Sequence, residues 1–66
     1  MNNLKKARLS RSITQEELAH ILGIAVRTYQ YIEYGQRKPS YDAILKLQEL
    51  FNSDINNLLS GSDDID

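Results

Sequence analysis

Glu16, Glu17 and His20 are residues of types that could support acid–base or metal chemistry. Glu16 and Glu17 are adjacent, so their side chains diverge around a helix and cannot act as a catalytic carboxylate pair. His20 is the single histidine and the chain has no cysteine, which argues against a structural zinc site. The sequence also shows no phosphate-binding loop and no nucleophile–base arrangement. We therefore expect neither an enzyme nor a bound cofactor or metal ion.

The cationic side chains are the other chemically useful group, and they are unevenly distributed. The net charge of the 66-residue chain is only −1. Residues 1–46, however, carry eight cations and four anions, a net of +4, whereas residues 47–66 carry five anions and no cation. A basic body with an acidic end suits a protein that binds phosphate with one face. Charge alone leaves a chance asymmetry in a small chain as the alternative.

Two short amphipathic helical patterns between Gln15 and Glu33 would position several of these side chains. They meet at Gly23, and a connection this short does not let the second helix run back beside the first. The helices must cross steeply, with Ala19 small enough for close approach and Gly23 free to adopt a left-handed conformation. This is the geometry of a helix-turn-helix, whose second helix projects outward and can enter a DNA major groove. The apolar stripes are Leu18, Ala19 and Leu22 in the first helix and Ile24, Tyr29 and Ile32 around the second.

The remaining pattern predicts an all-α domain of five helices. Thr14 and Glu17 form a capping box at the start of the second helix, Gly35 marks the end of the third, and Ser40 caps the fourth. Segments of alternating hydrophobicity are too short for strands. We expect one domain over residues 1–60 and a flexible acidic tail over 61–66. The expected helices cover roughly 2–9, 15–22, 26–34, a fourth with Ile44, Leu47 and Phe51, and a short fifth with Ile55, Leu58 and Leu59 capped by Asp54.

The chain resembles the lambda-repressor-like (Cro/XRE-type) DNA-binding family. The motif spans about residues 14–34, and the similarity continues through Gly35, through Pro39 and Ser40, and along the aliphatic run to Leu59. The resemblance therefore covers almost the whole chain. Such a resemblance is a more specific sign of the family than a match to the helix-turn-helix motif alone. The residues in register are Gln15, Leu18, Ala19, Leu22, Gly23, Ile24, Tyr29, Ile32 and Glu33.

The resemblance implies which residues contact DNA. Base edges would be contacted from the first turn and outer side of the second motif helix, by Val26, Arg27, Gln30 and Tyr31. Arg27 could donate two hydrogen bonds to guanine or bind phosphate, Gln30 could pair with adenine, and Val26 could pack on a thymine methyl. The alternative is that these are solvated residues on a helix surface. Phosphate contacts would come from Gln15, Thr28, Arg37 and Lys38.

The resemblance also implies a structural ion pair. Glu33 matches a family glutamate that pairs with an arginine of the first helix, and Arg8 occupies the matching place. We expect a partly buried Arg8–Glu33 pair, the alternative being two unrelated surface charges.

Three positions depart from the family pattern: Ala25 stands where a capping serine or threonine is usual, Ser53 replaces an aliphatic residue, and Ile21 occupies a polar site.

By resemblance we expect a cytoplasmic transcriptional regulator, a repressor, that binds double-stranded DNA at a palindromic operator as a homodimer. The expected self-contact lies around residues 51–59, where apolar residues outnumber the needs of the core. No apolar run approaches the roughly 20 residues needed to span a bilayer, and the N-terminus lacks a signal-peptide pattern. Two alternatives stay open. One is an antitoxin or restriction–modification controller with the same fold, and the other is a protein-interaction bundle that has lost DNA binding.

Overall fold

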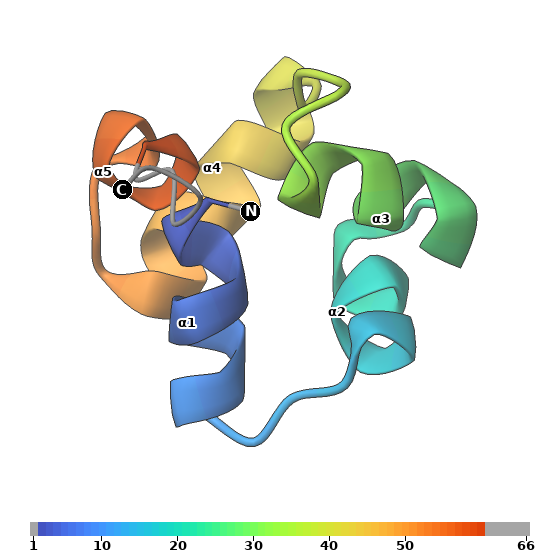
Figure 1. Ribbon diagram of the computed structural model, residues 1–66, viewed down its shortest axis with the longest axis horizontal. Helices are drawn as coiled ribbons and strands as arrows, with labels where there is room; N and C mark the ends of the chain where they lie inside the picture. The colour runs from blue at the N-terminus through green and yellow to red at the C-terminus, as the bar shows by residue number, and fades with distance from the viewer. Residues whose placement is uncertain (1, 61–66) are drawn as a thin grey trace.

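The computed structural model describes residues 2–60 and forms five α-helices over that range, with no strand (Figure 1). The predicted all-α, five-helix fold is confirmed. The first helix begins later than expected because Asn2 is its N-cap and accepts a hydrogen bond from the Leu4 amide. The tail predicted over 61–66 lies outside the described residues. The helices are α1 (Asn3–Ser10), α2 (Gln15–Leu22), α3 (Val26–Glu33), α4 (Tyr41–Phe51) and α5 (Ile55–Leu59).

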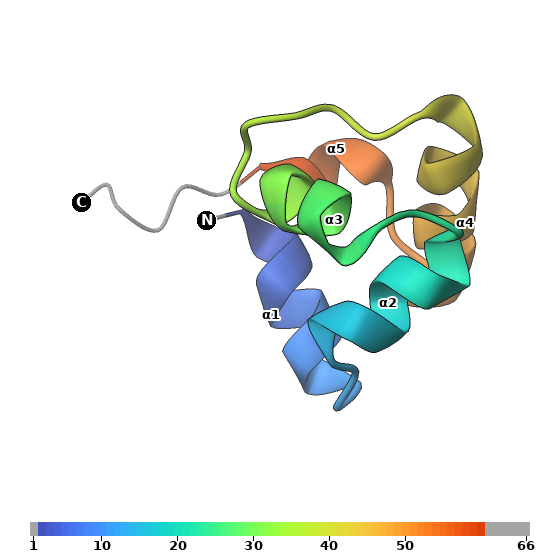
Figure 2. The ribbon, with the colours of Figure 1, turned by 90° about the vertical axis from the view of Figure 1, so that its right-hand side faces the viewer.

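The corner between α2 and α3 forms as the sequence predicts. Both hydrogen bonds of the Thr14–Glu17 capping box are present at the start of α2. At its end Gly23 takes the left-handed conformation, with φ +72° and ψ +31°, which costs a glycine little because it has no Cβ. The Gly23 and Ile24 amides donate to carbonyls of the last turn of α2. The chain therefore turns sharply, and α3 crosses α2 (Figure 2).

The core lies between these two helices and the other three. In Figure 1, α2 and α3 lie together on one side of the molecule, and α1, α4 and α5 on the other. From α4 the core takes Ala43, Leu47 and Phe51, which are spaced by four residues and so share one face. Ile44, predicted for this stripe, is only half-buried. The buried hydrophobic residues are Leu4, Leu18, Ala19, Leu22, Tyr29, Ile32, Ala43, Leu47, Phe51 and Leu58.

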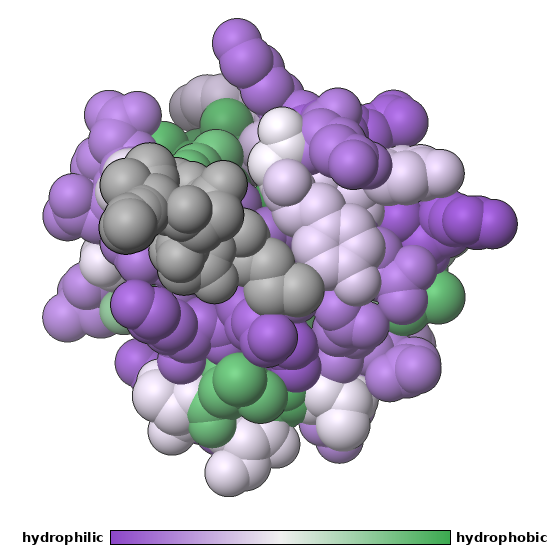
Figure 3. All heavy atoms as spheres, in the orientation of Figure 1, coloured by the Kyte–Doolittle hydropathy of each residue, from purple (hydrophilic) through white to green (hydrophobic). Residues whose placement is uncertain are grey.

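The reason given for a self-contact at residues 51–59 is wrong. Phe51 and Leu58 belong to the core, and Ile55 and Leu59 pack against it, so this segment has no surplus of apolar side chains. On the face shown in Figure 3, hydrophobic residues appear only as small separate areas among polar ones. The large hydrophobic residues exposed in the described part of the chain are Leu9, Ile21, Tyr31, Tyr34, Tyr41 and Leu45.

The start of α3 lacks a side-chain cap, as expected from Ala25. Ala25 has the extended conformation of an N-cap residue, but no side chain accepts a hydrogen bond from the first turn. We predict that Ala25→Ser stabilises the protein by about 1 kcal/mol and raises the melting temperature by about 4–8 °C. Thermal unfolding followed by circular dichroism measures the change. As a control, Ser40→Ala deletes the existing cap of α4 and should lower the melting temperature. An Ala25→Ser protein with the melting temperature of the wild type would contradict this prediction.

Candidate nucleic-acid interface

Helix α3 has a fixed inner side and a free outer side. Tyr29, Ile32 and Glu33 point into the molecule and are at most 2% exposed. Arg27 and Tyr31 lie on the other side and are exposed. Figure 2 looks onto this side of the molecule, where α2 and α3 lie in front of the other helices. Since α3 is held from behind, its outer side can meet a large partner without rearranging the core.

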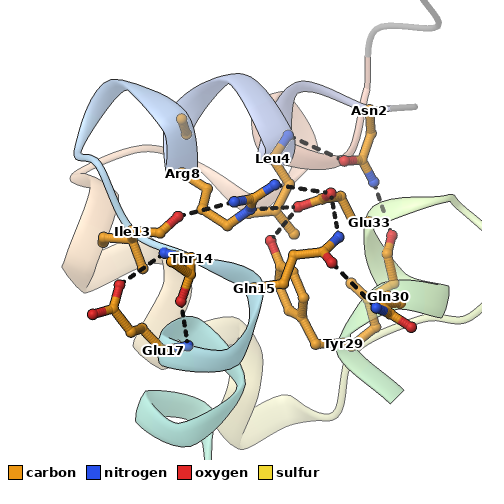
Figure 4. A network of polar contacts seen from close by, with 12 residues as sticks. Asn2, Leu4, Arg8, Ile13, Thr14, Gln15, Glu17, Tyr29, Gln30 and Glu33 are labelled. Carbon is orange, nitrogen blue, oxygen red and sulfur yellow. Dashed lines mark hydrogen bonds and ion pairs between the residues drawn. The ribbon is translucent and has the colours of Figure 1, made fainter. Parts of the chain in front are cut away.

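An ion pair between Arg8 of α1 and Glu33 of α3 holds the end of α3 (Figure 4). Arg8 Nε donates to Glu33 Oε2 at 2.8 Å, and Nη2 donates to Oε1 at 3.3 Å. The side chains of Arg8 and Glu33 are 8% and 0% exposed. Arg8 Nη1 also donates to the Ile13 carbonyl at 2.9 Å, so one guanidinium joins α1, the following loop and α3.

Two further side chains complete the coordination of the Glu33 carboxylate. The Tyr29 hydroxyl donates to Oε2 at 2.6 Å, and Gln15 Nε2 donates to Oε1 at 3.0 Å. Across residues 2–60, every buried side-chain nitrogen and oxygen has a hydrogen-bond partner. A buried charge is tolerated when it is paired and fully hydrogen-bonded in this way.

The side chains expected to contact bases differ in how free they are. Arg27 is exposed, and Tyr31 is 39% exposed. Gln30 is half-buried, and its Nε2 donates to Gln15 Oε1 at 3.2 Å. Val26 is half-buried and packs against the core, so only part of it faces outward. Arg27 and Tyr31 are thus exposed, whereas Gln30 between them in the sequence is held by its hydrogen bond to Gln15 of α2.

Three of the expected phosphate contacts lie together. Thr28 of α3 lines a hollow together with Arg37 and Lys38 of the loop that follows α3. The loop begins at Gly35, whose φ is +80°, and it is fixed by the buried Pro39. The fourth expected contact, Gln15, is the first residue of α2 and lies beside Gln30 instead. Arg37 and Lys38 are exposed, and such a pair of cations suits a phosphate group.

Comparison with known proteins identifies the family. The family model described as helix-turn-helix matches residues 4–58, which is most of the chain. The chain belongs to this helix-turn-helix family. The match confirms the resemblance seen in residues 14–34 and agrees with the expectation that the chain is not an enzyme.

Relatives of this helix-turn-helix chain carry regulator names. The chain is 34% identical over 59 residues to the uncharacterized HTH-type transcriptional regulator YqaE of Bacillus subtilis, covering 89% of this chain and 51% of YqaE. It is 29% identical over 62 residues to the cryptic phage CTXphi transcriptional repressor RstR of Vibrio cholerae, covering 94% and 56%. The chain thus spans about half the length of these two relatives. An uncharacterized HTH-type transcriptional regulator of Methanocaldococcus jannaschii is 35% identical over 63 residues, covering 96% of both chains. No solved structure matches the chain significantly.

Two features of the structure, one at the end of α3 and one between α1 and α4, were not predicted from the sequence. Tyr34 is 45% exposed and lies one turn beyond Gln30, where helical spacing from Gln30 could have found it. Arg11, one of the eight cations of residues 1–46, donates from Nη1 to the Leu50 carbonyl at 2.8 Å and lies over the Phe51 ring at 5.6 Å from its centroid. Arg11 therefore connects the end of α1 to α4.

Among the described residues no group of potential metal ligands comes together, and no helix is long and apolar enough to cross a membrane.

The buried network shifts the pKa of three groups. Burial raises the pKa of the Glu33 carboxyl, but the hydrogen bonds from Arg8, Tyr29 and Gln15 outweigh it and hold that pKa below its usual value. Burial and the hydrogen bond to Glu33 raise the pKa of the Tyr29 hydroxyl above its usual value. The hydrogen bond to Glu33 also raises the pKa of Arg8. At neutral pH the network therefore consists of a carboxylate, a guanidinium and a neutral phenol.

We predict that the protein loses stability in acid as Glu33 becomes protonated. Because the pKa of Glu33 is lower in the folded than in the unfolded chain, the folded state binds this proton more weakly. The stabilisation is fully present above the unfolded pKa of about 4.3 and is lost as the pH falls through the lower folded value. The free energy of unfolding, measured with urea between pH 7 and pH 2, should be constant above about pH 4.3 and should decrease below it. A free energy of unfolding that stays constant to pH 2 would contradict the prediction.

Proposed function

We propose that the protein is a sequence-specific DNA-binding transcriptional regulator, a repressor, that binds a palindromic operator as a homodimer. The observation that carries the proposal is the outer side of α3, where Arg27 and Tyr31 are exposed on a helix whose inner side is buried. Membership of the helix-turn-helix family and the repressor name of one relative support it. In this proposal α3 enters the major groove, where an α-helix fits and each base pair presents its own donors and acceptors.

Each set of side chains has a distinct role in this complex. Arg27 donates to a guanine edge or to phosphate, and Gln30 pairs with adenine. The exposed cations Arg37 and Lys38, together with Thr28, bind phosphate on one side of the groove, and the start of α2 at Gln15 approaches phosphate on the other. Phosphate contacts fix the position of α3, and base contacts supply the specificity.

The homodimer follows from how little sequence one domain can distinguish. A single helix contacts only a few base pairs, and a genome offers about 10⁶–10⁹ competing sites. Two copies double the contacted sequence and produce an inverted repeat with half-sites about 34 Å apart on one face of the DNA.

Selection of bound sequences from a random duplex library tests the proposal. We expect an inverted repeat, bound by two protein chains per duplex in sedimentation. An asymmetric consensus with one chain per duplex would contradict the homodimer. A library without enriched sequences would contradict specific DNA binding and favour the protein-interaction bundle.

A further inference from the structure

The Glu33 carboxylate dictates the orientation of the amide beside it. An ionised carboxylate only accepts hydrogen bonds and has about four acceptor sites. Arg8 fills two of them, and Tyr29 and Gln15 fill the other two. The Gln15 amide must therefore present its NH₂ group to Glu33 Oε1. In the flipped orientation, two oxygens would face each other at the 3.0 Å separation found between these atoms, with no hydrogen between them.

The fixed orientation of the Gln15 amide in turn fixes the orientation of the Gln30 amide. With its NH₂ group turned towards Glu33, Gln15 offers its carbonyl oxygen on the other side. Gln30 lies there and donates from Nε2 to that oxygen at 3.2 Å. Figure 4 shows the three side chains in sequence, from the buried Glu33 to the half-buried Gln30. The carboxylate in the core thus determines which end of the Gln30 amide is free.

The free end of Gln30 carries a carbonyl oxygen and one N–H. This pair matches adenine, whose major-groove edge offers the N6 amino group as donor and N7 as acceptor. Guanine presents two acceptors, O6 and N7, so an amide oxygen held in place would face O6 without a hydrogen between them. A glutamine that can rotate its amide could instead donate to guanine.

We infer that Gln15 is a positioning residue that holds the Gln30 amide in one orientation and so makes Gln30 select adenine over guanine. The inference rests on the proposed function and adds to it the source of discrimination at one base pair. It differs from a phosphate contact by Gln15, which would change affinity equally for all sequences.

The first experiment uses the free protein, so it does not depend on DNA. Hydrogen exchange of the Gln30 side-chain amide with water is measured by NMR in the wild type and in Gln15→Met. Methionine matches glutamine in length but offers no amide. Loss of the Gln15–Gln30 hydrogen bond should accelerate the exchange about two- to tenfold. Equal exchange in the two proteins would overturn the inference. Gln15→Asn, whose amide is one methylene shorter, gives an independent second variant.

The second experiment measures base preference in the selected operator. Gln30→Met identifies the base pair that Gln30 contacts. At that base pair, the preference of the wild type for adenine over guanine should fall about tenfold in Gln15→Met. Arg37→Met is the matched control, because loss of a phosphate contact should weaken binding without altering this ratio.

The outcomes separate the inference from the proposed function. An unchanged adenine-to-guanine ratio in Gln15→Met, with weaker binding to every sequence, would overturn the inference and leave specific DNA binding intact. Absence of any enriched sequence for the wild type would overturn the proposed function and the adenine preference with it. The exchange measurement would then still report whether Gln15 holds Gln30.

Discussion

Replacing Arg8 with methionine is expected to unfold most of the protein at 25 °C. The substitution leaves the Glu33 carboxylate, which is 0% exposed, without its cation in the interior. Removing one partner of a buried ion pair costs about 3–5 kcal/mol. A core of this size rarely supplies more than about 3–5 kcal/mol of stability in total. The loss therefore equals the whole stability expected for the domain. The helical signal in far-UV circular dichroism, measured at about 222 nm, should be mostly lost.

Two further variants make this prediction specific. Lys6→Met removes an exposed cation from the same helix and should unfold at nearly the wild-type temperature, since surface charges contribute little. The double variant Arg8→Met, Glu33→Met should be more stable than Arg8→Met, because no unpaired charge remains. Recovery should be partial, since the Tyr29 hydroxyl and the Gln15 amide lose their acceptor. A double-mutant cycle with no coupling between positions 8 and 33 would show that the pair does not stabilise the fold.

Replacing Arg27 with alanine is expected to weaken binding to the selected operator by roughly 5- to 150-fold, the effect of losing one base-specific arginine. Arg27 is exposed, so the variant should fold normally and its melting temperature should stay close to that of the wild type. The preference for one base pair of each half-site should also relax. Titration of labelled operator duplex at fixed salt concentration gives the dissociation constants, and salt must be fixed because phosphate contacts make the affinity strongly salt-dependent.

Lys46→Ala serves as the matched control for this variant. Lys46 is an exposed cation on α4, outside the proposed interface, so both variants remove one positive charge from the surface. If both weaken binding equally and neither changes the base preference, then Arg27 acts through net charge alone and the proposed contact is wrong.

Most of the fold was predictable because local chemistry specifies it. The Thr14–Glu17 capping box begins α2 where the pattern required, and Gly23 takes the left-handed conformation that the short corner demanded. Likewise Gly35 follows α3 with a positive φ. Each of these features depends on residues within a few positions of one another, so the sequence carries them directly.

The polar network could not be derived in full because it depends on three helices meeting. Resemblance to the family suggested the Arg8–Glu33 pair, but nothing local to Tyr29 indicated that its hydroxyl would meet the same carboxylate. The bonds from Gln15 to Glu33 and from Gln30 to Gln15 join positions 18 and 15 residues apart. The reason given for a self-contact at residues 51–59, a surplus of apolar side chains, was wrong on related grounds, since counting apolar residues does not reveal which of them the other helices cover.

The central claim is that the outer side of α3 contacts the bases, and NMR of the ¹⁵N-labelled protein titrated with its selected operator tests it most directly. We predict that the largest chemical-shift changes fall on Arg27, Gln30 and Tyr31, with further changes at Arg37 and Lys38, while α5 changes little. Shift changes concentrated on α1 and α5, with the resonances of α3 unaltered, would contradict the account.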